Sequence, residues 1–594
     1  MPILNDRIKK ILNIVFFILV PAVIMYLFEA YTHNPFKRMY PGIQVLNICL
    51  FVIIHAFFFF LTGKLKISLR IMTVIFMILG LAEYYLVEFR GVTLLPWDLG
   101  SLNTAAEVAG GYDYVPGVRA ICCIAGFVAV FLLTFLVDLE IGKRYVIRIC
   151  GVVISVILII LYTHFVQTAY AERTFGLYTK LFTPTAMSER DGTLTAFLYE
   201  LRYMNVEKPD GYNREEAEKL LSKYSYIEGD AKSADIIVVM NEAFSDLGIL
   251  GDFETSEDYM PFVHSLQNGE YKNAVTGTLN VSIVGGNTPN TEFEFLTGNS
   301  LAFLPEGSIP YQQYVDGNIE AIPGYLSSAG YSTIGMHPYL PGGWDRERVY
   351  PELGFDESVF LADFDRASPK LRNYISDMGC SKEIIKRYEK IKADGKKAFI
   401  FNVTMQNHSP YDKDFANLPL SVSINGAERS KETENAERYL TLIKKSDEAF
   451  EYLTKHFEDK EDPVVIVMFG DHQPSDSLVR PIWKMQGVDS RALTEEQVES
   501  RYMVPYVIWT NFDIEGVHGA DTSANLLGNK VLEIAGAGSY PYRQFLTDVS
   551  KHYPVLSAVS VVDNKGNKAD IDKLEGDEVI SGYRMLQYYE LFDK

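Results

Sequence analysis

Three side chains that suit a metal ion follow two apolar runs of the sequence. Glu242 comes just after the run at 235–240, and Asp471 and His472 come just after the run at 464–469. Two carboxylates and one imidazole form an oxygen and nitrogen ligand set, which suits Mn, Mg or Zn rather than a thiolate-bound metal. The alternative is that Asp471 caps a helix and His472 lies on the surface, but it leaves Glu242 without a role.

A hydroxyl group that a metal could activate lies in the segment 285–293. Its two leading glycines allow a close backbone approach, Thr288 sits where a helix N-cap is expected and Pro289 takes the first helical position. Thr291 or Glu292 can close the cap. A helix N-terminus favours phosphate, and a divalent cation lowers the pKa of bound water from about 16 to about 7, so a neighbouring alcohol could become a nucleophile. The alternative is that Thr288 is only a cap.

Four further side chains could hold a phosphorylated substrate. His408 can donate a proton or bind a phosphoryl oxygen, and Arg346 can form paired hydrogen bonds with phosphate. Trp344 offers an apolar face to a glycerol or acyl stem. His337 follows another apolar run, and it could equally be a packed histidine of the core.

These residues need a scaffold that brings distant segments together. From residue 231 short apolar runs alternate with helical stretches such as 435–456. Nearly continuous, β-branched runs predict strands buried on both faces of a mainly parallel sheet, which makes this part an α/β sandwich. Ligands sit beyond the carboxyl ends of such strands, where the polar residues gather. The expected strands are 235–240, 331–336, 398–403, 464–469 and 505–509.

The first part of the chain has a different pattern. Five apolar stretches are each near the ~20 residues that cross a membrane as a helix, and core helices of a soluble protein are the alternative. The stretches are 11–28, 44–62, 71–87, 120–137 and 146–166.

Charge agrees with this division. Residues 1–170 carry 13 Lys or Arg and 9 Asp or Glu, a net charge of +4, and the rest carries 42 and 67, a net charge of −25. The acidic total and the 48% of hydrophobic residues exclude a basic nucleic-acid binder and a disordered chain. Nine of the 13 basic residues precede the first span or lie in the second–third and fourth–fifth loops. This predicts a cytoplasmic N-terminus and an outward-facing remainder.

The predicted domains are a five-span anchor at 1–170, an amphipathic linker at 171–230 and an outer catalytic domain with a small C-terminal subdomain at 231–594. Only Cys380 lies in the outer domain, so this domain cannot form an internal disulfide. A large outer domain without disulfides indicates a protein of a bacterial surface. The triplet ending at Ala171 resembles a processing site, so release by cleavage there is a further expectation. The loop at 89–118 could dip back to the membrane or be an ordinary connector. No oligomeric state is indicated.

The order and spacing of these segments resemble the lipoteichoic acid synthase family, which are membrane-anchored members of the sulfatase and alkaline phosphatase superfamily. The resemblance covers nearly the whole chain. It rests on the five spans, on Arg90, Leu95, Pro96 and Asp98 in the loop at 89–118, and on the segments 241–244, 285–293, 343–346, 407–410 and 470–472.

The resemblance implies a catalytic threonine at Thr288, with His408 also at the catalytic centre. It implies that Glu242, Asp471 and His472, together with Thr288, hold manganese or magnesium (Mn2+ or Mg2+). An extracellular phosphoglycerol transferase of the bacterial cell membrane would follow.

The substrates that the resemblance implies are a lipid and a polymer. Phosphatidylglycerol would donate glycerol phosphate, held by His337, Trp344, Arg346 and His408, to Thr288 and release diacylglycerol. The unit would pass to a growing lipoteichoic acid or to its glycolipid anchor.

The sequence departs from the best-known members at Asn287, where lysine is common, and at Ala243 and Phe244 after the glutamate. The departures leave the donor headgroup and the acceptor open. Alternatives are a phosphoethanolamine transferase, a phosphatase or sulfatase-type hydrolase with the same site, and a non-catalytic envelope sensor or scaffold. A sulfatase needs a Cys or Ser in place of Thr288, and a scaffold would be expected to lose the ligand residues.

Overall fold

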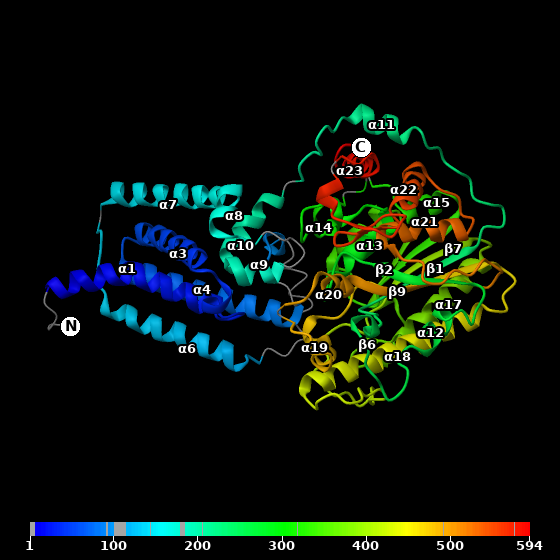
Figure 1. The fold of residues 1–594 in the computed structure, drawn as a ribbon, viewed down its shortest axis with the longest axis horizontal. Coiled ribbons are helices and arrows are strands. Elements are labelled where there is room, and N and C mark those ends of the chain that lie inside the picture. The colour runs from blue at the N-terminus through cyan, green and yellow to red at the C-terminus, as the bar shows by residue number, and fades with distance from the viewer. Residues whose placement is uncertain are drawn as a thin grey trace. The chain divides into compact units, whose positions relative to one another are not determined.

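The computed structural model describes two compact units of the chain. The described residues up to Met204 form the first unit, here called the helical unit, and Val206–Lys594 form the second, the sheet unit (Figure 1). The described residues are 6–90, 93–99, 115–142, 144–178, 184–204, 206–315, 317, 319–490, 492–574 and 576–594.

Five long helices make up most of the helical unit and confirm that the five predicted apolar stretches form helices. Each contains a stretch long and apolar enough to cross a membrane. They are α1 (Asp6–Glu29), α3 (Pro41–Thr62), α4 (Leu65–Arg90), α6 (Val118–Leu133) and α7 (Tyr145–Val166). Of the predicted loop at 89–118, residues 91–92 and 100–114 lie outside the described residues.

Small residues let these helices approach closely. α3 packs against α1, α4 and α7. At Gly151 of α7 an added Cβ would lie 2.2 Å from Cγ of Phe60, so a larger residue would push the ring of α3 away. Close packing through small residues is typical of membrane helices, because the hydrophobic effect does not drive helices together in lipid.

The segment after the last span is bound to the spans. α8 (Ala169–Phe175) begins directly after them and buries Ala171. In α10 (Thr193–Glu200), the Thr193 amide donates to Glu29 at 3.0 Å, and the Thr195 hydroxyl donates to Asn47 at 2.8 Å. Residues that the sequence assigns to a linker thus form part of the helical unit, and the predicted domain limits at 170 and 230 stay a prediction.

The sheet unit is built on eight strands in the order β10-β2-β9-β8-β1-β7-β3-β4. All neighbours are parallel except β9, which runs antiparallel to both β2 and β8, so the mainly parallel sheet is confirmed. The strands are β1 (Asp235–Asn241), β2 (Ala274–Asn280), β3 (Tyr331–Met336), β4 (Glu357–Val359), β7 (Lys397–Val403), β8 (Val464–Gly470), β9 (Met503–Thr510) and β10 (Thr522–Ser523).

Helices cover both faces of this sheet, as the α/β prediction requires (Figure 1). One face carries α12 (Pro261–Gln267), α17 (Asp377–Ala393) and α18 (Lys431–Phe457), and the other carries α13 (Thr288–Thr297), α15 (Ile322–Ser328) and α21 (Ala524–Ile534). β1 and β8 are buried along their whole length, which is why they read as unbroken apolar runs.

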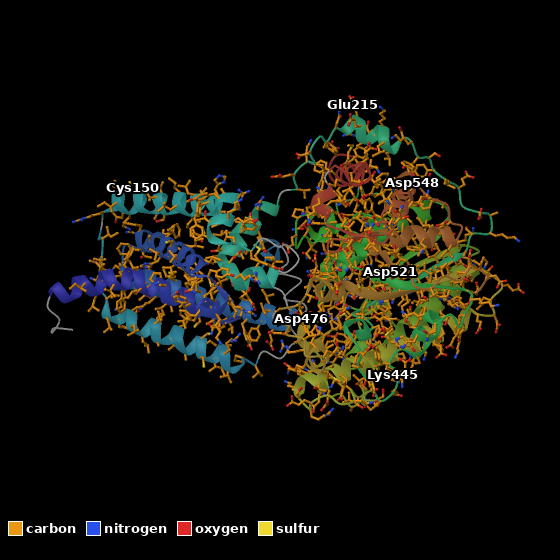
Figure 2. All side chains as sticks on the ribbon, viewed as in Figure 1. Cys150, Glu215, Lys445, Asp476, Asp521 and Asp548 are labelled. Carbon is orange, nitrogen blue, oxygen red and sulfur yellow. The ribbon has the colours of Figure 1, made fainter. Side chains whose placement is uncertain are left out.

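The C-terminal part adds a three-stranded sheet and two helices to the sheet unit. They are β11 (Val555–Leu556), β12 (Val561–Val562), β13 (Lys568–Ala569), α22 (Pro541–His552) and α23 (Glu578–Phe592). The acidic side chains labelled in Figure 2, among them Asp476 and Asp521, all belong to the sheet unit, whereas Cys150 lies on α7 of the helical unit.

Candidate active site

Five strands deliver the predicted site residues to one edge of the sheet. β1, β2, β3, β7 and β8 all run in the same direction, so their carboxyl ends lie at the same edge. The predicted residues follow these ends: Glu242 after β1, Thr288 after β2, His337 after β3, His408 after β7, and Asp471 with His472 after β8.

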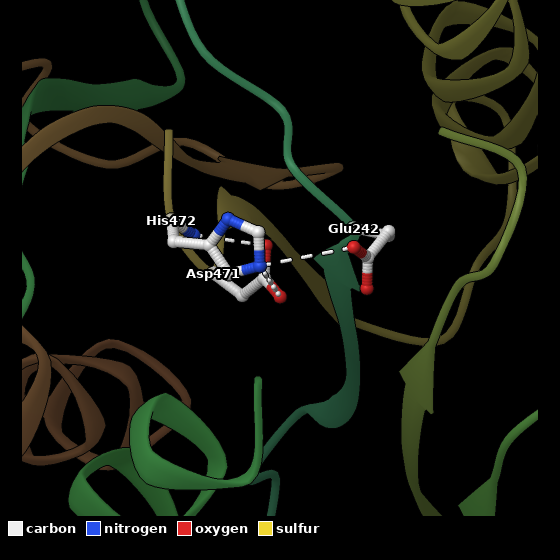
Figure 3. A group of neighbouring side chains, drawn as sticks. All are labelled: Glu242, Asp471 and His472. Carbon is white, nitrogen blue, oxygen red and sulfur yellow. Dashed lines mark hydrogen bonds and ion pairs between the residues drawn. The ribbon is translucent and has the colours of Figure 1, made fainter. Parts of the chain in front are cut away.

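Glu242, Asp471 and His472 form one buried cluster. The three offer ligand atoms that lie within 4.8 Å of one another. His472 Nε2 is 3.3 Å from Asp471 Oδ2 and 3.7 Å from Glu242 Oε1. Figure 3 shows the imidazole ring directed toward both carboxylates.

Two atoms of this cluster are buried without a hydrogen-bond partner. They are Asp471 Oδ2 and His472 Nε2. His472 Nδ1 donates to the Gln473 carbonyl at 2.8 Å, and this bond turns Nε2 toward the two carboxylates. Because native proteins rarely bury unpaired polar atoms, a cation is the group that fits here.

The charges of the cluster also favour a bound cation. Burial and the neighbouring Asp471 raise the pKa of Glu242 well above its usual range, because two carboxylates so close together repel. A divalent ion would remove that repulsion. Glu242, Asp471 and His472 therefore fit a divalent metal by donor type, spacing and unpaired atoms.

Thr288 lies beside this cluster but is not the helix cap that the sequence predicts. Asn287 is the N-cap of α13, in the left-handed region with φ 65°, and Thr288 is the first helical residue. The Thr288 hydroxyl donates to Glu242 Oε2 at 3.3 Å, away from its own helix. The correction has a physical cause, since asparagine tolerates the left-handed turn that follows two glycines.

Neither Thr291 nor Glu292 closes the cap of α13, contrary to the prediction. The Thr291 hydroxyl donates to the Asp471 carbonyl at 2.8 Å, which ties α13 to the end of β8. Glu292 faces Arg346. One turn of helix thus supports both the metal-ligand loop and the predicted phosphate-binding arginine.

Arg346 is buried and already paired with a carboxylate. Its Nε donates to both Glu292 oxygens at 3.1 and 3.2 Å, and Nη1 donates to the Gly343 carbonyl at 3.2 Å. Tyr350 also donates to Glu292, at 3.0 Å. Arg346 Nη2 also donates to Glu292 Oε1, so these bonds use three of the five N–H donors of the guanidinium and leave one on each terminal nitrogen. Although burial alone would lower it, Glu292 raises the pKa of Arg346.

The two predicted histidines beside Arg346 are neutral bases. Burial and Arg346 lower the pKa of His337 well below its usual range, and burial with Arg372 lowers the pKa of His408 to about 4. His337 Nδ1 contacts the Val403 carbonyl at 3.1 Å, and His408 Nδ1 contacts the carbonyl of the next residue at 2.7 Å. In both, Nε2 is therefore the proton acceptor.

Trp344 is half-buried in a short helical turn, η6 (Gly343–Asp345), that precedes Arg346. Trp344 and Asp345 both have left-handed backbones, with φ 57° and 60°. Such conformations are uncommon for residues with side chains and cluster at functional sites. The turn directs Arg346 into the interior, where it meets Glu292.

Sequence patterns do not indicate Arg372 as a residue of the site. It lies in a hairpin turn between β5 (Lys370–Leu371) and β6 (Tyr374–Ile375), and it is 5% exposed. Its guanidinium contacts the segment that carries His408. No motif signals this residue, because it is a single arginine between two strands of two residues each.

Comparisons with known proteins agree with this geometry. The sequence profile described as Sulfatase matches residues 234–537, just over half of the chain. The "Putative cyclic beta-1,2-glucan modification protein" of Rhizobium meliloti (strain 1021) is 29% identical over 412 residues, 68% of this chain and 62% of that protein. "Lipoteichoic acid synthase 1" of Bacillus subtilis (strain 168) is 25% identical over 327 residues, 54% of this chain and 48% of that one.

The chain therefore spans between about half and three fifths of the length of these curated relatives. Among solved structures, "Streptococcus pyogenes phosphoglycerol transferase GacH in complex with sn-glycerol-1-phosphate" superposes with a TM-score of 0.53 and 20% identity. The match covers 66% of this chain and 96% of that one. At this identity the likeness shows a shared fold.

Proposed function

Because the chain belongs to the sulfatase family, we propose that it is a metal-dependent phosphoglycerol transferase of the bacterial cell envelope. It would move glycerol phosphate from phosphatidylglycerol, through Thr288, to lipoteichoic acid or its glycolipid anchor. The observation that carries the proposal is the Thr288 hydroxyl, which lies at a helix start and donates to Glu242 at 3.3 Å beside two unpaired ligand atoms.

Glu242, Asp471 and His472 would hold the metal, with Thr288 as a further ligand, and manganese or magnesium suits this donor set. When bound, a divalent ion would lower the pKa of the Thr288 hydroxyl and balance negative charge on the phosphate. Loss of stoichiometric metal from Asp471→Ala, measured on purified protein, tests this assignment independently of activity.

In the first step Thr288 Oγ1 would lose its proton and form a bond to phosphorus while the bond from phosphorus to the diacylglycerol oxygen breaks, and a proton would pass to that oxygen so that diacylglycerol leaves as the alcohol. The two spare N–H groups of Arg346 would bind the phosphoryl oxygens. The N-terminus of α13 adds favourable polarity, because the first N–H groups of a helix are free to meet an anion.

In the second step an acceptor hydroxyl attacks the same phosphorus and frees Thr288. His408 is neutral at pH 7 and its Nε2 accepts, so it would take the proton of the incoming hydroxyl, and a proton returned to Thr288 Oγ1 would restore the threonine hydroxyl. His337 and Trp344 would hold the glycerol end. If water takes the place of the acceptor, the same groups would support a hydrolase.

The test is full-length protein in liposomes of phosphatidylglycerol with manganese. Release of diacylglycerol with growth of a glycerol phosphate polymer or glycolipid supports the proposal. Activity only with phosphatidylethanolamine would favour a phosphoethanolamine transferase, and free glycerol phosphate alone would favour a hydrolase. Absence of turnover with every donor would favour a sensor or scaffold.

A second acceptor class is favoured by one comparison. The relative at 29% identity is named for cyclic β-1,2-glucan modification. A soluble glucan would then receive glycerol phosphate from the same threonine. Parallel reactions with a glycolipid and with a cyclic glucan, followed by mass spectrometry of both, separate the two acceptors.

The proposed location is a multi-pass position in the membrane, with the N-terminus in the cytoplasm and the sheet unit outside. The distribution of Lys and Arg across the loops supports it. Labelling of Cys380 from outside is excluded by its burial, so a cysteine introduced at exposed Glu215 is the reporter to use. Release near Ala171 would require α8 to unfold, because Ala171 is buried within it.

A further inference from the structure

The hairpin turn at Arg372 has a backbone conformation that a residue with a side chain rarely adopts. Arg372 has φ 51°, in the left-handed region. Asn417 holds the turn: its side chain accepts from the Arg372 amide at 3.2 Å and donates to the Arg372 carbonyl at 3.1 Å. Because Asn417 holds Arg372 in this uncommon conformation, the position of the Arg372 side chain is a candidate for a functional role.

The guanidinium of Arg372 binds three carbonyls of one short segment, residues 406–410. Nη2 donates to the carbonyls of Gln406 and His408 at 2.5 and 2.6 Å, and Nη1 donates to the carbonyl of Pro410 at 2.7 Å. The segment, here called the His408 segment, leaves β7 and lies over the active-site edge. A rigid fork can satisfy several carbonyls at once, which an ammonium group cannot do with the same geometry.

The His408 segment is fixed at its start as well. The Gln406 side chain accepts from the Asp377 amide at 3.0 Å, and the Asn407 side chain donates to Asn241 at 3.0 Å. Around the histidine itself, the Arg372 guanidinium is the group that joins the carbonyls of Gln406, His408 and Pro410. Since His408 Nδ1 bonds to the Ser409 carbonyl, the ring turns with this backbone.

Aromatic rings complete the contact. Arg372 lies over the ring of Tyr374 at 5.3 Å and over the ring of Tyr411 at 5.5 Å. Tyr374 in turn lies 6.2 Å from the His408 ring, centroid to centroid. The same arginine therefore fixes the backbone behind His408 and one ring beside it.

We propose that Arg372 is a positioning residue that sets the place of His408 Nε2 in the active site. It acts through the carbonyls of the His408 segment and contacts no predicted metal ligand in these bonds. The inference rests on the proposed function for its catalytic readout, because His408 is the base of that reaction, whereas the structural readout does not depend on it.

Arg372→Asn is the informative variant, because asparagine accepts the left-handed backbone but lacks the guanidinium. With full-length protein in phosphatidylglycerol liposomes, we expect kcat to fall about a hundred-fold, as a displacement of about 1 Å of a catalytic group does, with KM for the lipid little changed. Hydrogen exchange should rise at residues 404–411 and remain unchanged in β1 and β8.

A double-mutant cycle shows whether the effect passes through His408. In a His408→Ala background Arg372→Asn should lower kcat less than two-fold further, because coupled residues are not additive. Arg543→Lys is the control: it alters another buried arginine that binds carbonyls, those of Phe295 and Asn525, and should show additive losses with His408→Ala.

Equal losses from Arg372→Asn with and without His408 would overturn the proposal, as would unchanged exchange at 404–411. If Arg372→Asn fails to fold, Arg372→Lys takes its place, and full wild-type kcat with unchanged exchange in that variant would overturn it as well. If wild type shows no transfer at all, the proposed function fails, and the exchange result alone then decides the role of Arg372 in holding the segment.

Discussion

Two buried acidic clusters of the sheet unit handle their charge in opposite ways. Glu292 is paired with Arg346 and also accepts from Tyr350, so its negative charge is balanced by the protein. Glu242 and Asp471 lie beside His472, and no Lys or Arg of the described residues forms an ion pair with either carboxylate. The protein itself balances the first cluster, whereas the second has the donor set that a cation would complete.

The difference separates residues that hold the structure from residues that we propose to perform chemistry. A balanced carboxylate fixes its partner, and here Glu292 fixes Arg346 with two donors spare. In the other cluster, burial and the neighbouring Asp471 raise the pKa of Glu242. We expect substitutions in the two clusters to differ in kind, one affecting stability and the other affecting metal and turnover.

The largest effect is expected for Asp471→Ala. Loss of a ligand should remove the ion, and the several kcal/mol of charge stabilisation that a metal provides correspond to a loss of turnover of about a thousand-fold or more. Turnover is measured as diacylglycerol release, and bound metal by elemental analysis. Stoichiometric manganese in Asp471→Ala would contradict the ligand set.

Next comes Glu292→Gln, which leaves Arg346 buried and unpaired. Breaking a buried ion pair costs about 3–5 kcal/mol, so the thermal unfolding midpoint of the sheet unit should fall by many degrees. The matched change in the other cluster, Asp471→Asn in metal-free protein, should leave the midpoint equal or raise it, because repulsion is relieved. Equal destabilisation by Glu292→Gln and Asp471→Asn would contradict the difference between the two clusters.

Chelation should act on the unbalanced cluster alone. An ion at a hundred times its dissociation constant stabilises the folded state by about 2.7 kcal/mol. Removing it should lower the unfolding midpoint of wild type and of Glu292→Gln but not of Asp471→Ala. A shift of the same size in Asp471→Ala would place the stabilising ion elsewhere.

Another buried carboxylate, Glu294, gives the smallest effect. Burial raises its pKa to about 7, although Leu301, Ser282 and Ser300 donate to it. Because the pKa of Glu294 is higher in the folded than in the unfolded protein, Glu294 contributes its full stability below the unfolded pKa near 4.5. This contribution is lost as pH rises toward 7. Glu294→Gln should remove a slope of at most about 1.4 kcal/mol of stability per pH unit between pH 4.5 and 7. An unchanged slope of stability against pH would contradict it.

The strands that position the site were predictable because burial on both faces leaves an unbroken apolar run, as in β1 and β8. β2 was missed, because its sequence mixes Thr, Gly and Asn and only part of it is fully buried. The family, predicted from motif order, and the five apolar helices, predicted from hydropathy, are confirmed.

Within the site, residue types were predictable and pairings were not. The sequence indicates that Glu242, Asp471 and His472 meet, because each follows a parallel strand. It does not reveal that Asn287 takes the cap position and turns the Thr288 hydroxyl toward Glu242. It also does not reveal the Glu292–Arg346 pair, since two residues 54 positions apart meet only through the fold.

The central claim is that the Thr288 hydroxyl attacks phosphorus beside the unbalanced cluster. The most direct measurement is mass spectrometry of the peptide that contains Thr288, after acid quench of wild-type protein with phosphatidylglycerol labelled in its headgroup glycerol. We predict labelled glycerol phosphate on Thr288, and neither adduct nor diacylglycerol release in Thr288→Ala. Diacylglycerol release by Thr288→Ala at the wild-type rate would contradict the account.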